Sequence, residues 1–281
     1  MKKIIWISSY PKSGNTFLRS LLVSYFFSKN GHFDQRDLAN ISEFPRDYFN
    51  FVKEDDFLNE FLDWENKQRM ISENCKQMTF LKTHLANIKI KENYYSINPK
   101  FTLCSIYIVR DPRNVILSLK DHFQMNISEA EKFLFNEKKV LNMQKDGLLK
   151  SFTPILDWGS NYKSWNKKNL ERNLIIKYEN LVLRTQETFK KVLKHIMKYN
   201  KFIINEKKLA HSINTTSFDD LKKIEQNSGF IEKKIMGLEK NPNLFFNKGI
   251  TRDYKKNEND KQIFKNIEKK YFEIMTQLNY L

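Results

Sequence analysis

The N-terminal segment places a strand, a turn and a helix in an order that strongly constrains the fold. Residues 3–9 are apolar and β-prone on both faces, which is typical of a strand inside a parallel sheet. A Pro-Lys-Ser-Gly turn follows at 11–14, and from Asn15 to about Ser28 apolar residues recur at helical spacing. Proteins often hold phosphate groups with this arrangement, although the G-x-x-x-x-G-K-[ST] order is missing. We therefore predict an anion site at this turn.

A second segment repeats the pattern, because Leu103–Val109 predicts a buried strand and Pro112 suits the first turn of a helix that runs to about Phe123. Further strands are predicted at 78–82 and 173–177. Helices are predicted at 154–168, 185–198, 206–213, 218–226 and from about 261. Another helix is expected after residue 123, where Ser128 and Glu131 resemble a capping box. An irregular helical region is predicted at 44–70 and an ordered loop at 241–260. We expect a single α/β domain over 1–281, with a P-loop-like central parallel sheet and helices on both faces.

Composition narrows the class of protein. Apolar residues make up 40% of the 281 residues, so a folded globular chain is expected. The net charge of +16 would suit a polyanion, but the lysines are dispersed, which favours solvated helix faces. Cys75 and Cys104 give neither a disulfide framework nor metal-ligand spacing. Pro11 and Lys12 interrupt the first apolar run, so we expect no membrane span and a cytoplasmic protein.

The first turn carries candidate ligands for an anion. Lys12, Ser13 and Thr16 surround Gly14, so one cation, two hydroxyls and a helix N-terminus would meet a cluster of anionic oxygens, for which phosphate is the natural choice. The alternative is an ordinary turn that is capped by Asn15 and carries a surface lysine.

Two further turns carry candidate residues. Arg110 ends a predicted strand, and Ser118 lies eight positions later on the following helix. Ligands of α/β proteins bind at this edge of the sheet, and arginine can bind phosphate through two hydrogen bonds. The alternative is a structural network between Arg110 and Asp111. His84 follows the strand at 78–82 and would face the same crevice, where histidine can accept a proton near neutral pH; a structural or exposed histidine is the alternative.

Five segments together resemble the cytosolic-type sulfotransferases. "SYPKSGNTF" looks like their 5′-phosphosulfate motif, "YIVRDPRNVILSL" is similar to their 3′-phosphate motif, and "LKTHL" matches the segment of their catalytic histidine. "TTSFDDLKK" and "FFNKGITRDYKK" resemble their adenosine-contacting segment and their glycine loop. This resemblance implies transfer of a sulfuryl group from 3′-phosphoadenosine-5′-phosphosulfate (PAPS) to a hydroxyl or amine, with 3′-phosphoadenosine-5′-phosphate (PAP) as product and without a metal.

The resemblance also implies roles for individual residues. Lys12 would contact the bridging oxygen and the 5′-phosphate, and His84 would take the proton of the acceptor. The implied donor-binding residues are Ser13, Gly14, Asn15 and Thr16 at the 5′-phosphate, Arg110, Ser118, Lys248 and Gly249 at the 3′-phosphate, with Asn247 in place of the family's loop arginine, and Phe17, Tyr178, Thr216, Ser217 and Phe218 at the adenosine. Ser13 would also modulate Lys12 before the acceptor binds.

Several departures from the family pattern and two rival functions stay open. Asn247 stands where the family has a loop arginine, so one charged contact with the 3′-phosphate is lost unless Arg252 or Lys255 supplies it. Phe17 stands where the family has Trp. We therefore expect weaker donor binding. A nucleotide kinase is one rival, disfavoured because neither G-K-[ST] nor a strand-terminal carboxylate is in place. A basic module that binds nucleic acid or membranes is the other. The expected partner is a small-molecule acceptor, which could be an alcohol, a phenol, a glycoside or a lipid headgroup, without nucleic acid; oligomeric state is left open.

Overall fold

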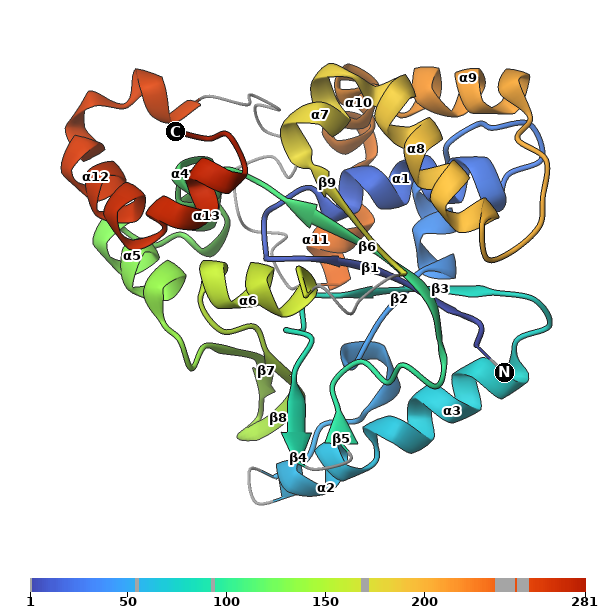
Figure 1. Cartoon of the computed structure of the whole chain (residues 1–281), viewed down its shortest axis with the longest axis horizontal. Helices are drawn as coiled ribbons and strands as arrows, with labels where there is room; N and C mark the ends of the chain where they lie inside the picture. The colour runs from blue at the N-terminus through green and yellow to red at the C-terminus, as the bar shows by residue number, and fades with distance from the viewer. Residues whose placement is uncertain (1, 54–55, 92–93, 168–171, 236–245, 247–252) are drawn as a thin grey trace.

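The computed structural model describes residues 2–281 except 54–55, 92–93, 168–171, 236–245 and 247–252. Its centre is a five-stranded sheet in the order β2-β3-β1-β6-β9 (Figure 1). The strands are β1 (Ile4–Ser9), β2 (Ser42–Glu43), β3 (Thr79–Thr83), β6 (Thr102–Val109) and β9 (Asn173–Lys177), and every neighbouring pair is parallel. The parallel sheet brings the carboxyl ends of β3, β1 and β6 together, since Ser8 pairs with Thr83 and Ser9 with Ile108.

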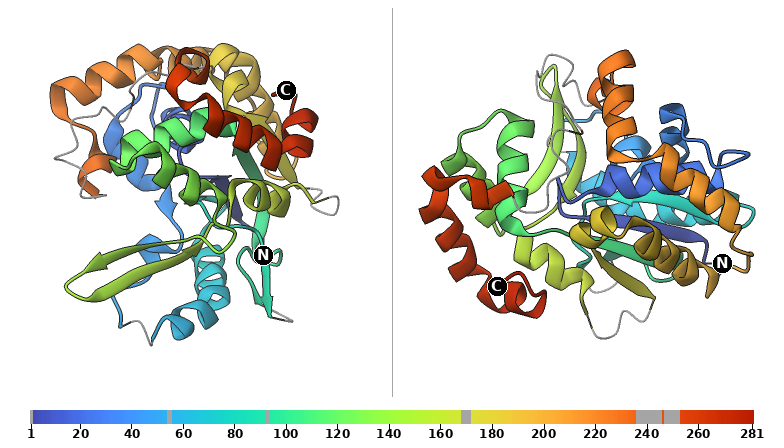
Figure 2. Two further views of the ribbon diagram at one scale, coloured as in Figure 1. Left: turned by 90° about the vertical axis from the view of Figure 1, so that its left-hand side faces the viewer. Right: turned by 90° about the horizontal axis from the view of Figure 1, so that it is seen from above.

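Helices cover both faces of this sheet, as predicted (Figure 2). Successive strand residues point to opposite faces, so Ile5 and Ile7 join one core cluster while Ile4 and Trp6 join the other. The first cluster packs against α1 (Asn15–Phe26), α8 (Thr185–Met197), α9 (Glu206–Thr215) and α10 (Phe218–Ser228). The second packs against α4 (Pro112–Phe123), α5 (Ile127–Phe135), α6 (Trp158–Trp165), α12 (Lys261–Lys270) and α13 (Phe272–Gln277).

Smaller elements surround this core. An antiparallel hairpin of β7 (Val140–Lys145) and β8 (Leu148–Pro154) projects from the body (Figure 2). The others are β4 (Lys89–Lys91), β5 (Tyr94–Tyr95), α2 (Phe57–Leu62), α3 (Trp64–Asn74), α7 (Tyr178–Leu183), α11 (Ile231–Ile235) and the 3₁₀ turns η1 (Gln35–Asn40), η2 (Arg46–Tyr48), η4 (Asp253–Lys256) and η5 (Glu258–Asp260).

The structure corrects three local predictions. The capping box of α5 consists of Asn126 and Glu129, not Ser128 and Glu131, because Asn126 has extended backbone geometry and exchanges both bonds with Glu129. Pro154 ends β8 instead of beginning a helix, and α6 starts at Trp158 after the cap Asp157. The strand predicted at 78–82 runs from 79 to 83.

The β7–β8 hairpin was missed although its turn carries a recognisable signal. Asp146 and Gly147 join the two strands, and both have positive φ angles, of 52° and 75°. An Asp-Gly pair between two strands favours the tight turn whose twist matches that of a hairpin. The sequence patterns predicted no strand at residues 140–153, so a wall of the cavity described below was missed.

The turn between β1 and α1 has left-handed backbone geometry at two positions. Lys12 has φ 64°, and Gly14, the N-cap of α1, has φ 96°. A Cβ atom on Gly14 would lie 2.4 Å from Cδ2 of Tyr178. Glycine is therefore required here twice, for its backbone conformation and for the close approach of the tyrosine ring.

We predict that Gly14→Ala lowers the free energy of unfolding by roughly 2–4 kcal/mol, because it combines left-handed strain with a steric clash. Gly147→Ala is the matched control, since Gly147 has φ 75° but nothing within 4 Å of its added Cβ; it should cost about 1 kcal/mol. Urea denaturation measures both. Equal losses would show that the contact with Tyr178 does not restrict this position.

Candidate active site

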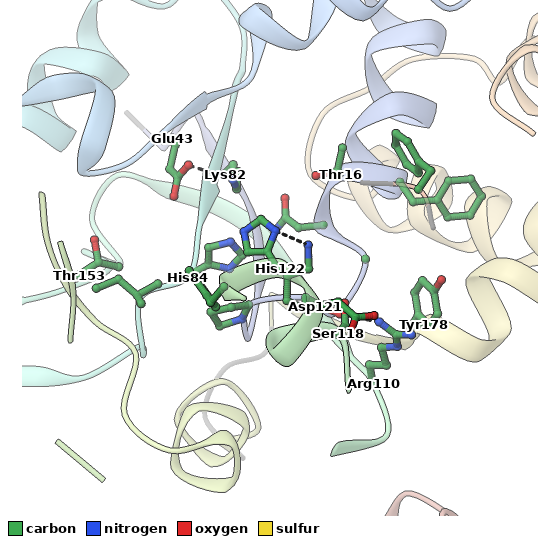
Figure 3. A pocket seen from close by; sticks show the side chains of 18 of the residues that line it. Thr16, Glu43, Lys82, His84, Arg110, Ser118, Asp121, His122, Thr153 and Tyr178 are labelled. Carbon is green, nitrogen blue, oxygen red and sulfur yellow. Dashed lines mark hydrogen bonds and ion pairs between the residues drawn. The ribbon is translucent and has the colours of Figure 1, made fainter. Parts of the chain in front are cut away.

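A cavity of about 340 Å³ lies at the carboxyl edge of the sheet (Figure 3). Its walls come from the turn after β1, the start of α1, β2, the end of β3, α4, the β7–β8 hairpin, α7 and α10. Ten of the predicted residues line it together: Lys12, Gly14, Asn15, Thr16, Phe17, His84, Arg110, Ser118, Tyr178 and Phe218. The sheet therefore brings the three predicted turns into one site.

The other predicted residues do not line this cavity or cannot be placed. Ser13 is fully buried, and its hydroxyl has no hydrogen-bond partner among the described residues. The hydroxyl of Thr216 donates to the carbonyl of Ser212 at 2.6 Å, and Ser217 caps α10. Those two side chains therefore serve helices α9 and α10. The predicted residues Asn247, Lys248 and Gly249 lie outside the described residues.

Two side chains at the start of α1 are already engaged within the protein. Nδ2 of Asn15 donates to the carbonyl of Ile7 at 3.0 Å, which ties the helix back to β1. The hydroxyl of Thr16 donates to Glu232 at 2.6 Å, and Glu232 also pairs with Arg19. Although burial opposes it, Arg19 and Lys82 lower the pKa of Glu232 to about 2. Because a hydroxyl has one proton, Thr16 can donate to a phosphate only when it releases Glu232.

The Lys12 side chain reaches the last turn of α4. Its Nζ lies 3.1 Å from Nδ1 of His122. Burial and the nearby Arg110 lower the pKa of Lys12 to about 7, since both disfavour the ammonium. Burial and Lys12 lower the pKa of His122 to about 3. His122 was not among the predicted site residues, although it lies four residues after Ser118 and helical periodicity places both on one face.

The guanidinium of Arg110 lies between the turn and α7. It donates to the carbonyl of Lys12 at 2.8 Å and stacks 4.4 Å from the ring centre of Tyr178. Asp111, considered above as a partner for Arg110, instead pairs with Arg113 at 2.7 Å and caps α4. Nε of Arg110 has no hydrogen-bond partner among the described residues. This arginine therefore keeps a buried donor that an anion could satisfy.

His84 is held as a neutral imidazole. Its Nδ1 lies 2.7 Å from the carbonyl oxygen of Ser9. A carbonyl only accepts, so Nδ1 carries the proton and Nε2 keeps its lone pair. Burial and the charge of Lys82 lower the pKa of His84 to about 4. The imidazole can therefore accept a proton throughout the neutral range.

A buried ion-pair cluster adjoins His84. Lys82 donates to Glu43 at 2.9 Å, and Arg46 pairs with the same carboxylate at 2.7 Å. Although burial opposes it, Lys82 and Arg46 lower the pKa of Glu43 to about 2. Lys82 was not among the predicted site residues, yet it precedes His84 by two positions, and a strand places such residues on one face. All four side chains line the cavity.

Within the described part of the chain, no group of three His, Cys, Asp or Glu side chains could hold a metal ion. No helix there is long and apolar enough to cross a bilayer.

The chain is similar to several known proteins. Flavonol 4′-sulfotransferase of Flaveria chlorifolia is 23% identical over 254 residues, which cover 89% of this chain and 72% of that protein. Mouse sulfotransferase SULT7A1, solved in complex with PAP, has a TM-score of 0.57 at 18% identity and covers 99% of this chain and 84% of its own. Retinol dehydratase, solved with androsterone and inactive cofactor PAP, has a TM-score of 0.57 at 15% identity, covering 97% and 80%. The sulfotransferase domain model matches residues 2–279, so the chain belongs to the sulfotransferase family.

Proposed function

We propose that this protein transfers a sulfuryl group from PAPS to a hydroxyl group of a small-molecule acceptor. The observation that carries the proposal is the meeting of Lys12, Arg110 and the neutral imidazole of His84 in one cavity. Two cations suit a donor with two phosphate groups, and a neutral histidine suits a hydroxyl that must lose its proton. The family assignment supports this reaction over a kinase or a nucleic-acid module. We take 1–281 as one sulfotransferase domain.

The donor would bind along the turn, α1 and α4. The N-terminus of α1 and Lys12 would hold the 5′-phosphate, while Arg110 and Ser118 would hold the 3′-phosphate. The buried Nε of Arg110 without a partner fits such an anion. The aromatic rings of Phe17, Tyr178 and Phe218 line the same cavity and offer faces for adenine. PAP in the solved SULT7A1 and retinol dehydratase structures supports this donor.

The acceptor would bind on the side of His84 that is walled by Phe123 and the β7–β8 hairpin, where Leu141, Met143 and Thr153 line the cavity. Nε2 of His84 takes the hydroxyl proton, and the oxygen attacks sulfur. The bond from sulfur to the bridging phosphate oxygen breaks, and its electron pair leaves with PAP. The ammonium of Lys12 stabilises the charge that develops on this oxygen. As in phosphoryl transfer, the transition state is expected to be loose, with charge developing on the leaving oxygen. A buried cation that is already in position suits such a reaction.

Donor binding can be measured directly by calorimetry with PAP in the absence of magnesium. Wild type should bind, and Arg110→Ala should bind roughly 10–100-fold more weakly because it loses charge-assisted hydrogen bonds. Arg184→Ala is the matched control, since the side chain of Arg184 is 65% exposed and is not among the residues that line the cavity. Absence of binding to wild type at millimolar PAP would overturn the assigned donor.

The affinity for PAP should fall as pH rises through about 7. Lys12 has a pKa of about 7 without ligand, and the phosphates of PAP raise it by favouring the ammonium. Binding above this pH therefore takes up a proton, and log affinity declines by up to about one unit per pH unit. Calorimetry in buffers of different ionisation enthalpy measures the uptake. Lys12→Met should abolish it; unchanged uptake in that variant would assign the titration to another group.

His84→Ala should lower kcat by roughly 10²–10⁴-fold, the usual contribution of a general base. In wild type, kcat/KM should not fall as pH drops below 6.5, the ordinary pKa of histidine, because the pKa of His84 is lowered to about 4. Turnover is followed with labelled PAPS and a panel of alcohols, phenols and glycosides. His32→Ala, at an exposed histidine, is the control. Retained turnover in His84→Ala would show that His84 is not the general base.

A further inference from the structure

We propose that His122 is a positioning residue that fixes the ammonium group of Lys12 in the cavity. The inference rests on the proposed function, in which Lys12 meets the leaving phosphate oxygen. His122 lies in the last turn of α4, one turn beyond Ser118, and both residues line the cavity. Its Nδ1 is 3.1 Å from Nζ of Lys12, a contact that joins residues 110 positions apart (Figure 3).

The direction of this hydrogen bond follows from the two groups. An ammonium can only donate, so Nδ1 of His122 accepts and Nε2 carries the proton of the neutral ring. His84 has the opposite tautomer, because its Nδ1 donates to the carbonyl of Ser9. The low pKa of His122, about 3 because of burial and Lys12, keeps this acceptor available at neutral pH. The two histidines therefore perform different tasks within one cavity.

Lys12 is held at both of its ends by the β6–α4 unit. Arg110 donates to its backbone carbonyl at 2.8 Å, and His122 accepts from its ammonium. A lysine side chain has four flexible methylene groups, so an unrestrained ammonium would lose rotamer entropy when it meets the donor. A bond to His122 removes much of that freedom before the donor binds. The helix that carries Ser118 thus also sets the position of the reactive lysine.

The bond to His122 favours the charged form of Lys12, since a hydrogen bond accepted from an ammonium stabilises it. The charged or titratable groups that shift the pKa values of this pair are Arg110 after β6, Lys82 and His84 at the end of β3, Glu225 on α10 and Glu232 on α11. Asp121, next to His122 on α4, lines the same cavity. Removal of the acceptor while these groups stay in place should lower the pKa of Lys12. PAP affinity would then begin to fall at lower pH than in wild type.

Two substitutions separate this role from plain packing of the ring against Phe123, whose centre lies 4.8 Å away. His122→Leu removes the acceptor at similar size, and His122→Asn keeps an amide oxygen close to the position of Nδ1. We expect His122→Leu to bind PAP about tenfold more weakly than wild type at about pH 8, but within about threefold at about pH 6. His122→Asn should stay within about threefold of wild type at both pH values.

A double-mutant cycle with Lys12→Met completes the test. If His122 acts through Lys12, His122→Leu should have no further effect in the Lys12→Met background. An equal loss at both pH values, or an additive loss in that background, would assign His122 a structural role and overturn the inference. If wild type binds PAP and His122→Leu has the same pH profile as wild type, the inference is overturned and the proposed function stays intact. If wild type does not bind PAP, both the inference and the proposed function are overturned. Should His122→Leu not fold, His122→Phe supplies the variant without an acceptor.

Discussion

The site depends on the way the left-handed turn after β1 is locked in place. A lysine with φ 64° is held in an unfavourable backbone conformation, and the hydrogen bond from Arg110 to its carbonyl stabilises it. The ring of Tyr178 packs against both Arg110 and Gly14. Three strands of one parallel sheet must end side by side for these contacts to form. The register of β1, β6 and β9 therefore determines where the candidate site forms.

Charge balance explains how the protein tolerates so many buried ionisable groups at this edge. Glu43 pairs with Lys82 and Arg46, Arg46 also pairs with Asp47, and Glu232 pairs with Arg19. Lys12 donates to the neutral imidazole of His122 and lies near another cation, Arg110. Burial and the charge of Arg110 lower the pKa of Lys12, since both disfavour the ammonium. An anionic ligand at this edge of the sheet would favour the charged form of Lys12.

Local sequence patterns predicted the main elements of the fold and several groups of the site. Apolar strands followed by turns predicted β1, β6 and their helices, and the residue types at the turns indicated an anion site. The β7–β8 hairpin and the cavity residues Lys82 and His122 were missed. Their local signals, an Asp-Gly turn and spacings of two and four residues, are common in ordinary surfaces, so only the assembled sheet identifies them as walls of a cavity.

The sequence by itself determined which chemical groups the turns carry and, through the continuous apolar run along β1, that both faces of the sheet are buried. Tertiary structure alone decided which atoms of those groups stay available. Thr16 donates to a carboxylate 216 residues away, and Lys12 donates to a histidine 110 residues away. Tautomers and shifted pKa values at His84 and Lys12 follow from burial and from such distant partners. Local propensity contains no information about either, because folding creates the low-dielectric cavity in which those effects arise.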